Sequence, residues 1–305
     1  MSIGIDHGFG WMKTSHVSFP AGIVPFDHEP HSMKQTLQYK NRYYVCGSGR
    51  QALKRDKTAD ESYALLTLAA IAEELRARGG VREATVTLAA GLPLTQYGLE
   101  KVRFRSYLLS FFAEPVRFRY EDERFEIAVK DVLLYPQGYA AVMGNLPRLM
   151  REPSTNVIDI GSWTTDAMRL DYGRVNAETC RSLEHGMIRC VGEVQEQVRR
   201  GTGLSLTEAQ VEQMIRSGAL AESEDDPLKQ IAAAHVKRYA KSLLGTIMEN
   251  GFDINAVPTT FLGGGAALVL YSADRSVLER SSFIDDIHAN AKGYEQIAGQ
   301  VCGNA

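Results

Sequence analysis

An aspartate, a glycine-rich turn and a lysine follow one another near the start of the chain. Asp6 ends an apolar run that begins at Ile3, and Gly8 and Gly10 separate it from Lys13. Glycines in a tight turn let successive backbone N–H groups converge on an anion, as in phosphate-binding nests. A carboxylate at a strand end suits Mg²⁺, and a lysine adds positive charge for phosphates. The segment therefore predicts half of a magnesium–phosphate site.

A second segment repeats this order of residue types in the middle of the chain. Asp159 lies near the end of an apolar run, Gly161 opens the turn, and Thr164, Thr165 and Asp166 follow. Such a turn also exposes backbone N–H groups and hydroxyls to an anion. One segment alone would fit an ordinary β-hairpin with a polar turn, but its recurrence in each half favours a duplicated ligand-binding device.

A glycine triplet forms a third segment of interest. Gly263, Gly264 and Gly265 follow a predicted strand at residues 259–262 and precede a predicted helix. Backbone without side chains can lie directly against a flat ligand or a phosphate. A plain strand-to-helix turn has the same composition, so the triplet alone does not indicate a ligand site. Its interpretation depends on the first two segments.

The three segments, in this order, resemble the two phosphate loops and the adenosine loop of the actin, Hsp70 and sugar-kinase superfamily. A fourth segment, residues 133–141, resembles the first connecting helix of that superfamily. In these proteins the helix carries a glutamine or glutamate that orients the attacking water, and Gln137 takes this place. The alternative for Gln137 is an ordinary polar residue in the first turn of a helix.

Within the superfamily, the sequence most resembles plasmid-segregation actins of the ParM and StbA type. The resemblance rests on Gly-Leu-Pro at 91–93, the second phosphate segment at 159–166 and the tail at 289–294. It implies an α/β, actin-like (ribonuclease H-like) duplicated fold with two lobes around a nucleotide cleft. It also implies an ATPase that polymerises into filaments for plasmid DNA segregation, helped by a DNA-binding adaptor protein.

The resemblance also implies roles for individual residues. The residues expected to bind ATP (or GTP) are Asp6, Gly8, Lys13, Gly161, Thr164, Thr165, Gly263, Gly264 and Gly265. Mg²⁺ would lie between Asp6 and Asp159, and the catalytic set would be Gln137, Asp159 and Asp166. Asp166 has a structural alternative, a hydrogen bond at the start of a strand. Glu193 is a candidate adenine contact in the helical insertion at about 186–250.

Two other functions fit the same fold. A sugar-type kinase is one, because Glu-His-Gly at 184–186 resembles a sugar-kinase signature. A kinase needs a carboxylate base near the acceptor hydroxyl, which Gln137 cannot supply, and Asp131 does not occupy a recognised position. The other is a scaffold that binds nucleotide without hydrolysing it.

Apolar periodicity predicts the elements that must position these residues, with strands and helices alternating in both halves. Strands are predicted at 3–5, 13–19, 81–89, 259–262 and twice between 116 and 132. Helices are predicted at 58–78, 97–112, 137–150, 186–200, 207–216, 228–250 and twice near the end. A capping pair, Thr58 and Glu61, would begin the first helix, and Gly79-Gly80 would end it. Pro153 marks the predicted boundary between lobes 1–152 and 153–305.

The composition is that of a globular protein, with 305 residues, 44% hydrophobic and 23% charged. A net charge of -3 gives no overall basic excess of the kind that drives non-specific DNA binding, and we expect no direct, sequence-specific contact with nucleic acid. No apolar run approaches a membrane span, and the scattered cysteines indicate reduced thiols. We therefore expect a cytoplasmic protein without membrane contact. His7, beside Asp6, lacks a metal-binding partner at helical spacing and is interpreted as a surface or turn residue.

Overall fold

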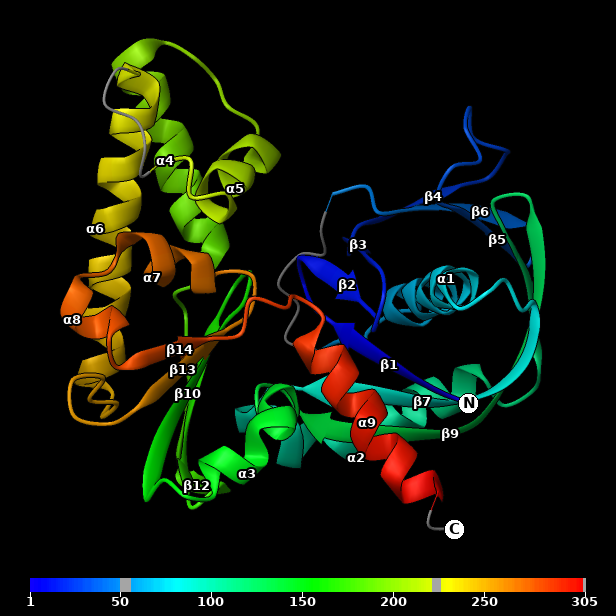
Figure 1. Cartoon of the computed structure of the whole chain (residues 1–305). Helices are drawn as coiled ribbons and strands as arrows, with labels where there is room; N and C mark the ends of the chain where they lie inside the picture. The colour runs from blue at the N-terminus through cyan, green and yellow to red at the C-terminus, as the bar shows by residue number, and fades with distance from the viewer. Residues whose placement is uncertain (50–55, 221–225, 304–305) are drawn as a thin grey trace. The chain divides into compact units, whose positions relative to one another are not determined.

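The computed structural model describes residues 1–49, 56–220 and 226–303 (Figure 1). By compactness the chain divides into unit 1, which comprises Met1–Gly144 and His288–Ala305, and unit 2, which is Asn145–Ile287. The lobes expected from the sequence, 1–152 and 153–305, stay a prediction. The compact division falls after residue 144, and the last helix belongs to unit 1.

Unit 1 is built on a mixed sheet in which nine of the described strands take part. Their order is β3-β2-β1-β7-β9-β8-β5-β6-β4, with β1, β7 and β9 parallel at the centre. The strands are β1 (Ser2–His7), β2 (Trp11–Lys13), β3 (Ser18–Pro20), β4 (Ile23–Phe26), β5 (Thr36–Tyr39), β6 (Arg42–Cys46), β7 (Glu83–Leu92), β8 (Val116–Tyr120) and β9 (Glu123–Pro136). The helices of this unit are α1 (Ser62–Ala77), α2 (Leu94–Phe111), the 3-10 helix Ala140–Asn145 and α9 (Ala289–Gly303).

Helices cover both faces of strand β1. Ile3 and Ile5 are fully buried in the same core as α1, whereas Gly4 between them lies against Ala291 of α9. Since neighbouring side chains of a strand point to opposite faces, α1 and α9 pack on opposite sides. A side chain at position 4 would overlap the Ala291 carbonyl, so glycine allows α9 to pack this closely.

A buried carboxylate joins α1 to the turn after β2. Glu74 of α1 accepts hydrogen bonds from Thr14 Oγ1 at 2.5 Å, His16 Nδ1 at 2.6 Å and Arg78 Nε at 2.6 Å. Burial opposes the charge of Glu74, but these hydrogen bonds outweigh it and lower the pKa of the carboxyl. Arg78 also donates to Glu295 of α9 at 2.5 Å, so the network ties the sheet edge to both helices.

Unit 2 holds a smaller sheet with helices packed above it. Five described strands have the order β12-β11-β10-β13-β14. They are β10 (Ser154–Ile160), β11 (Thr165–Asp171), β12 (Arg174–Leu183), β13 (Thr259–Leu262) and β14 (Ser281–Phe283). The helices are α3 (Leu146–Leu149), α4 (Met187–Thr202), α5 (Glu208–Arg216), α6 (Pro227–Glu249), α7 (Ala266–Ser272) and α8 (Arg275–Leu278).

The helices of unit 2 follow their sequence patterns closely. Met187, Cys190, Val191, Val194 and Val198 of α4 recur at helical spacing and are all buried, in one core with α5 and α6. Thr207 and Gln210 form the reciprocal capping box that begins α5. The predicted helices at 186–200, 207–216 and 228–250 are therefore confirmed within two residues at each end.

Several predicted elements of unit 1 differ from the structure. The segment 13–19 is two strands rather than one, because Thr14 N donates to Val17 O at 2.8 Å and closes a turn. Helix α1 begins at Ser62 rather than Thr58, since Thr58 donates through both its N and Oγ1 to Asp56 Oδ1 instead of capping a helix. Its predicted end is confirmed by Gly79 and Gly80, with φ of +112° and +80°.

The end of the chain also differs from the prediction. Two short helices, α7 and α8, precede strand β14, and one long helix, α9, closes the chain. Among the residues that the structure describes, none of the helices combines the length and apolar character needed to cross a bilayer.

Candidate functional site

The first predicted phosphate turn is a tight hairpin between β1 and β2. Asp6 on β1 lies directly opposite Lys13 on β2, and Gly8 N donates to Trp11 O at 3.1 Å across the turn. A side chain at position 8 would bring its Cβ within 2.5 Å of the Trp11 oxygen. Glycine at this position is therefore required by the turn itself.

Gln137 lies 131 positions after Asp6 in the sequence but contacts it at the end of this hairpin. The Asp6 carboxylate is 5% exposed, and its two oxygens lie 3.0 Å from Gln137 Nε2 and 3.6 Å from Lys13 Nζ. A carboxylate accepts only from the amide nitrogen, so the contact fixes the orientation of the Gln137 side chain. The amide oxygen of Gln137 keeps its capacity to accept a hydrogen bond from water.

Gln137 lies in a turn, not in the connecting helix predicted at 137–150. Strand β9 continues to Pro136, and Gln137 N donates to Leu92 O at 2.9 Å, which holds the turn to the end of β7. The 3-10 helix Ala140–Asn145 and the short α3 take the place of the single predicted helix. Pro147, at the start of α3, has no N–H to continue a helix through this point.

The buried Lys57 contacts the first turn. Lys57 Nζ donates to His7 O at 2.6 Å and lies 4.9 Å from the ring of Phe9 and 5.6 Å from that of Tyr63. An ammonium on a backbone carbonyl and two aromatic faces is well satisfied although Lys57 is buried. No sequence signal indicated this contact, because lysine side chains are usually exposed and Lys57 lies fifty positions after His7 in the sequence.

The interpretation of His7 as a surface residue is wrong. His7 is fully buried, and its Nε2 lies 2.9 Å from Thr67 Oγ1 of α1. Burial, together with the nearby Lys57 charge, lowers the pKa of His7 to about 3. The imidazole is therefore neutral at physiological pH and acts as an anchor between the hairpin and α1.

The second predicted turn repeats the first in its register. Asp159 on β10 lies opposite Asp166 on β11, and Gly161 N donates to Thr164 O at 2.8 Å. In both hairpins an aspartate faces the residue seven positions later, and the glycine two positions after the aspartate closes the turn. The recurrence seen in the sequence is thus a recurrence of structure.

The residue opposite the aspartate differs between the two hairpins. Directly opposed side chains of an antiparallel pair lie on the same face of the sheet. Asp6 therefore faces a cation, Lys13, whereas Asp159 faces a second carboxylate, the buried Asp166. Two neighbouring carboxylates repel each other unless a cation or a proton is shared, so the second hairpin suits a divalent cation.

The start of helix α4 packs onto the second turn. Met187 N and Ile188 N donate to Gly161 O at 3.0 Å and to Ser162 O at 2.9 Å. Thr165 Oγ1 donates to His185 O at 2.6 Å, so this hydroxyl is used within the protein. A side chain at Gly186 would overlap the backbone at Ser162 and Trp163, so glycine permits this close packing.

The glycine triplet completes the same site in unit 2. Strand β13 runs parallel to β10 with Leu262 beside Asp159, and Gly265 N donates to Ile160 O at 2.9 Å. Gly263 has φ of +84°, and a side chain there would overlap the Asp159 carboxylate. The triplet and the second turn are therefore neighbours.

Helix α5 adds a residue that the sequence did not indicate. Arg216 lies beside the triplet, since its guanidinium would be 3.1 Å from a Cβ at Gly264. The same guanidinium lies 3.7 Å from the carboxylate of Glu212, one helical turn earlier. Glu193, the candidate adenine contact, lies on α4 and pairs with Arg189 at 3.5 Å, with half of its side chain exposed. Because Arg216 lies beside the triplet, it is a better candidate than Glu193 for an adenine contact.

The donors present fit Mg²⁺ bound together with phosphate. Mg²⁺ prefers oxygen ligands and keeps several waters, so one or two carboxylates suffice when phosphates supply the rest. Asp159 and Asp166 offer such oxygens beside a turn that can hold phosphate. In the described part of the chain, no three His, Cys, Asp or Glu side chains gather into a protein-only metal cage.

Comparisons with known proteins agree with this geometry. The family model described as "Actin like proteins N terminal domain" matches residues 4–139, and "Archaeal actin homologue MreB-like, C-terminal" matches residues 157–273. No curated protein matches the sequence significantly. The chain belongs to the actin-like proteins, and its two matched segments contain both hairpins and the glycine triplet.

Solved structures share this fold over nearly the whole chain. Ta0583, an archaeal actin homologue in complex with ADP, is 18% identical with a TM-score of 0.74, over 98% of this chain and 99% of its own. Bacillus thuringiensis ParM with ATP is 15% identical with a TM-score of 0.69, over 99% of each chain. An Alp12 filament structure is 14% identical with a TM-score of 0.68, over 100% of this chain and 99% of its own. The resemblance to actin-like proteins of the ParM type and the α/β actin-like fold are thereby confirmed.

Proposed function

We propose that this chain binds and hydrolyses ATP, or GTP, with Mg²⁺ and polymerises into filaments that segregate plasmid DNA. The observation that carries the proposal is the pair of hairpins with one register, each with an aspartate opposite its partner and a glycine-closed turn. Such turns suit phosphate oxygens, and two of them suit a nucleoside triphosphate better than a single phosphate group.

Each residue of the site then has a role in binding or positioning. Lys13 and the N–H groups of both turns, other than those of Gly8 and Gly161 that close the hairpins, bind phosphate oxygens. Asp159 and Asp166 hold the metal through its waters. When bound, Mg²⁺ neutralises charge on the phosphates that are being cleaved. Gln137, oriented by its bond to Asp6, positions the attacking water through its amide oxygen, as glutamines do in other NTPases.

The relatives support the nucleotide and the assembly. Ta0583 was solved with ADP, ParM of Bacillus thuringiensis with ATP, and Alp12 as a filament. We extend these properties to this chain, including assembly with further copies of itself. Plasmid segregation also needs a link to DNA, and the net charge of -3 favours a separate DNA-binding adaptor in the cytoplasm.

A sugar-type kinase on the same fold has less support. Its candidate base, Asp131, accepts a hydrogen bond from Arg105 at 2.6 Å and another from Val132 N at 2.7 Å. Both contacts are made to Oδ1 and hold Asp131 in an ion pair with Arg105, as expected for a structural residue. A scaffold that binds nucleotide without hydrolysis is the remaining alternative, and Gln137 beside Asp6 argues against it.

A paired assay separates these functions. Phosphate release is measured with ATP, with and without a panel of sugars, while sedimentation is followed with ATP, ADP and no nucleotide. We expect sugar-independent phosphate release and a pellet that depends on ATP. Sugar-stimulated turnover without a pellet would support the kinase, and a pellet without phosphate release would support the scaffold.

A further inference from the structure

The first turn of helix α9 meets the turn that carries Gln137. Asn290 is 7% exposed, and its Oδ1 accepts a hydrogen bond from Gly138 N at 2.9 Å. The two residues are 152 positions apart in the sequence, and Gly138 directly follows Gln137. A side chain of the last helix therefore binds the backbone beside a residue of the candidate site.

The backbone at Gln137 adopts a conformation that needs support. Tyr139 N donates to Gln137 O at 2.8 Å, and Gly138 between them has φ of +73°. A three-residue turn with positive φ at its centre is the rare and strained form of the γ-turn, and surrounding contacts must hold it. The Gln137 N–H is bound by Leu92 O, so the buried N–H of Gly138 is the next group that needs a partner.

Close packing of α9 brings Asn290 to this turn. Asn290, Gly293 and Tyr294 are spaced at i, i+3 and i+4, so they share one face of the helix. A side chain at Gly293 would overlap the carbonyl oxygen of Ala140, and glycine there lets α9 pack against the residues that follow the turn. Gly91, near the end of β7, likewise leaves room for the hydroxyl of Tyr294.

Tyr294 also fixes α9 on the strand that leads into the turn. Its ring is fully buried and stacks on that of Tyr135 in β9, with centroids 6.2 Å apart and planes at 11°. Tyr135 lies two positions before Gln137. Asn290 is thus held by a packed helix, which positions a side chain more precisely than a loop does. The segment 289–294, a sequence signature without a physical reason until this point, places Asn290 against the turn.

We propose that Asn290 is a positioning residue for Gln137, a role that rests on the function proposed above. Asp6 holds the nitrogen of the Gln137 amide, but the place of the Gln137 backbone depends on the turn. Asn290 fixes the turn through the Gly138 N–H, so the amide oxygen stays where it can accept a hydrogen bond from the attacking water. In this role Asn290 acts through Gln137 and contacts neither the nucleotide nor the water.

Two substitutions of Asn290 test its hydrogen-bond acceptor. Asn290→Ala removes the acceptor and leaves the buried Gly138 N–H without this partner, so the turn can shift and take the Gln137 amide with it. Asn290→Asp keeps an acceptor oxygen, and the helix dipole favours a carboxylate in the first turn of a helix. The two variants therefore separate loss of the acceptor from other effects of changing this residue.

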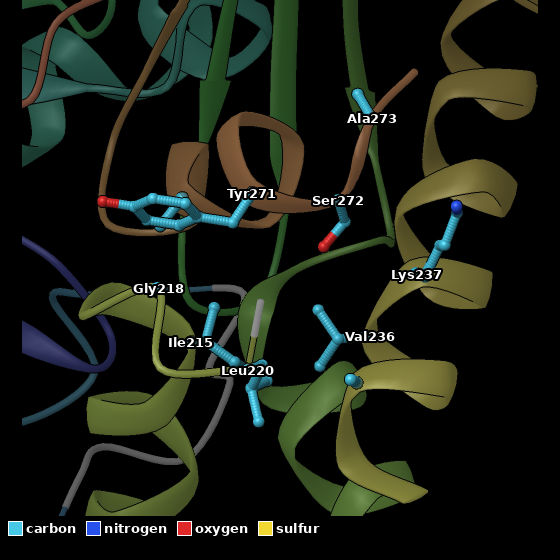
Figure 2. A pocket seen from close by; sticks show the side chains of 10 residues that line it. Ile215, Gly218, Leu220, Val236, Lys237, Tyr271, Ser272 and Ala273 are labelled. Atoms are coloured by element: carbon cyan, nitrogen blue, oxygen red, sulfur yellow. The ribbon is translucent and has the colours of Figure 1, made fainter. Parts of the chain in front are cut away.

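The control variant lowers stability without changing the turn. Val236 of α6 is 3% exposed and is one of the residues of unit 2 that line a pocket of about 230 Å³ between α5, α6 and α7 (Figure 2). Val236→Ala enlarges this pocket and should lower the Tm, as loss of a buried side chain does. Gln137, Gly138 and Asn290 all belong to unit 1, so turnover of this variant should equal that of the wild type.

Phosphate release at saturating Mg-ATP measures kcat, and titration calorimetry measures the Kd for ATP. We expect Asn290→Ala to lower kcat by about tenfold, which is a smaller loss than that of Gln137→Ala because Asp6 still holds the Gln137 amide. The Kd should change by less than about twofold, since no residue that binds nucleotide is altered. Asn290→Asp should restore kcat to within about threefold of the wild type, because the turn keeps its acceptor.

A double variant shows whether Asn290 acts through Gln137. If it does, Gln137→Ala combined with Asn290→Ala should release phosphate at the rate of Gln137→Ala alone, because the group that Asn290 positions is already absent. A residue that acts independently of Gln137 would add its own loss of about tenfold in the double variant. Such a further loss would overturn the positioning role.

The remaining outcomes separate this role from the proposed function. Normal kcat in Asn290→Ala, beside slow release in Gln137→Ala, would overturn the role of Asn290 and leave the proposed ATPase standing. Equal losses of kcat in Asn290→Ala and Val236→Ala would also overturn it, since lost stability would then explain both. A wild-type chain that binds ATP and releases no phosphate would overturn the proposed hydrolysis and the role of Asn290 together.

Discussion

At the scale of single residues, the proposed function gives the two hairpins different roles. Asp6 has its own cation in Lys13, 3.6 Å away, whereas Asp159 faces the carboxylate of Asp166. In the first hairpin, Lys13 would bind phosphate and the oriented Gln137 would position water. The second concentrates negative charge where a metal can neutralise it. Within the proposed function, this difference favours Asp159 over Asp6 as the residue that holds the metal.

Removal of the Asp159 carboxylate tests that assignment. Asp159→Ala should lower Mg-dependent hydrolysis by at least about a hundredfold, because charge on the phosphates is no longer compensated in place. Phosphate release at saturating ATP is the measurement, and unchanged circular dichroism should show an intact fold. Asp122→Asn, at an exposed carboxylate with side-chain exposure of 84%, is the control. Wild-type turnover of Asp159→Ala would remove the central role of this residue.

Gln137 should separate hydrolysis from assembly. Without its amide oxygen the attacking water loses its position, and Gln137→Ala should release phosphate about a hundredfold more slowly. The other residues keep their phosphate and metal contacts in this variant. Assembly with ATP should therefore persist, and the filaments should last longer. Light scattering after a limited addition of ATP measures their lifetime. Normal phosphate release in this variant would refute the role assigned to Gln137.

The buried His7 predicts a dependence of stability on pH. Its pKa is lowered from the ordinary 6.5 to about 3, first by burial and then by Lys57. Between these values the unfolded chain binds a proton that the folded chain excludes, so stability falls as pH decreases from about 6.5 towards about 3. His7→Gln keeps a polar group for Thr67 and should show a smaller loss of Tm between pH 7 and pH 5. An identical loss in both proteins would mean that other groups cause it.

At the scale of elements, close packing explains the glycine at position 263 but not the glycine at position 251. Gly263 and Gly251 both have positive φ, at +84° and +91°, but only Gly263 has the Asp159 carboxylate where a Cβ would lie. Gly251→Ala should destabilise the fold by about 1–2 kcal/mol through the left-handed backbone, and Gly263→Ala by more, because its side chain also overlaps Asp159 and Ile160. Only Gly263→Ala should also weaken ATP binding, measured by titration calorimetry. Equal affinities for the two variants would contradict the proximity of triplet and nucleotide.

Sequence patterns predicted elements best where one local rule decided the outcome. The amphipathic stripe of α4 and the capping box of α5 act within a few residues, and both helices were predicted to within two residues of their ends. The start of α1 was not, because Thr58 bonds Asp56 where the chain loops before the helix. The placing of Gln137 in a helix failed for a similar reason, since a backbone bond to Leu92 holds it in a turn.

Prediction of the site residues was limited in the same way, by contacts between residues far apart in the sequence. Residue types and spacing were enough to select Asp6 and Lys13, and the family resemblance selected Gln137. The fold then brings the three together. Lys57 and Arg216 were missed because their positions depend on how α1 and α5 pack, which no short motif records. The burial of His7 was missed too, since a histidine beside an aspartate gives no sign of the helix that covers it.

At the scale of the whole molecule, a ligand that binds the folded chain must stabilise it. ATP with Mg²⁺ at one hundred times its dissociation constant should add about 2.7 kcal/mol to the free energy of unfolding. The melting temperature should therefore rise by several degrees and depend on nucleotide concentration. The control is EDTA, which removes the metal and should reduce the shift. No shift at millimolar ATP would argue against any nucleotide site.

The central claim is that ATP builds the filament and its hydrolysis dismantles it. The most direct measurement follows light scattering and phosphate release together after a limited addition of ATP to the wild-type chain. We predict that scattering rises at once, reaches a plateau and falls as phosphate accumulates, and that a second addition restores it. Phosphate release without any rise in scattering would leave an ATPase but contradict the filament. Scattering that persists after all ATP is consumed would contradict the coupling of hydrolysis to disassembly.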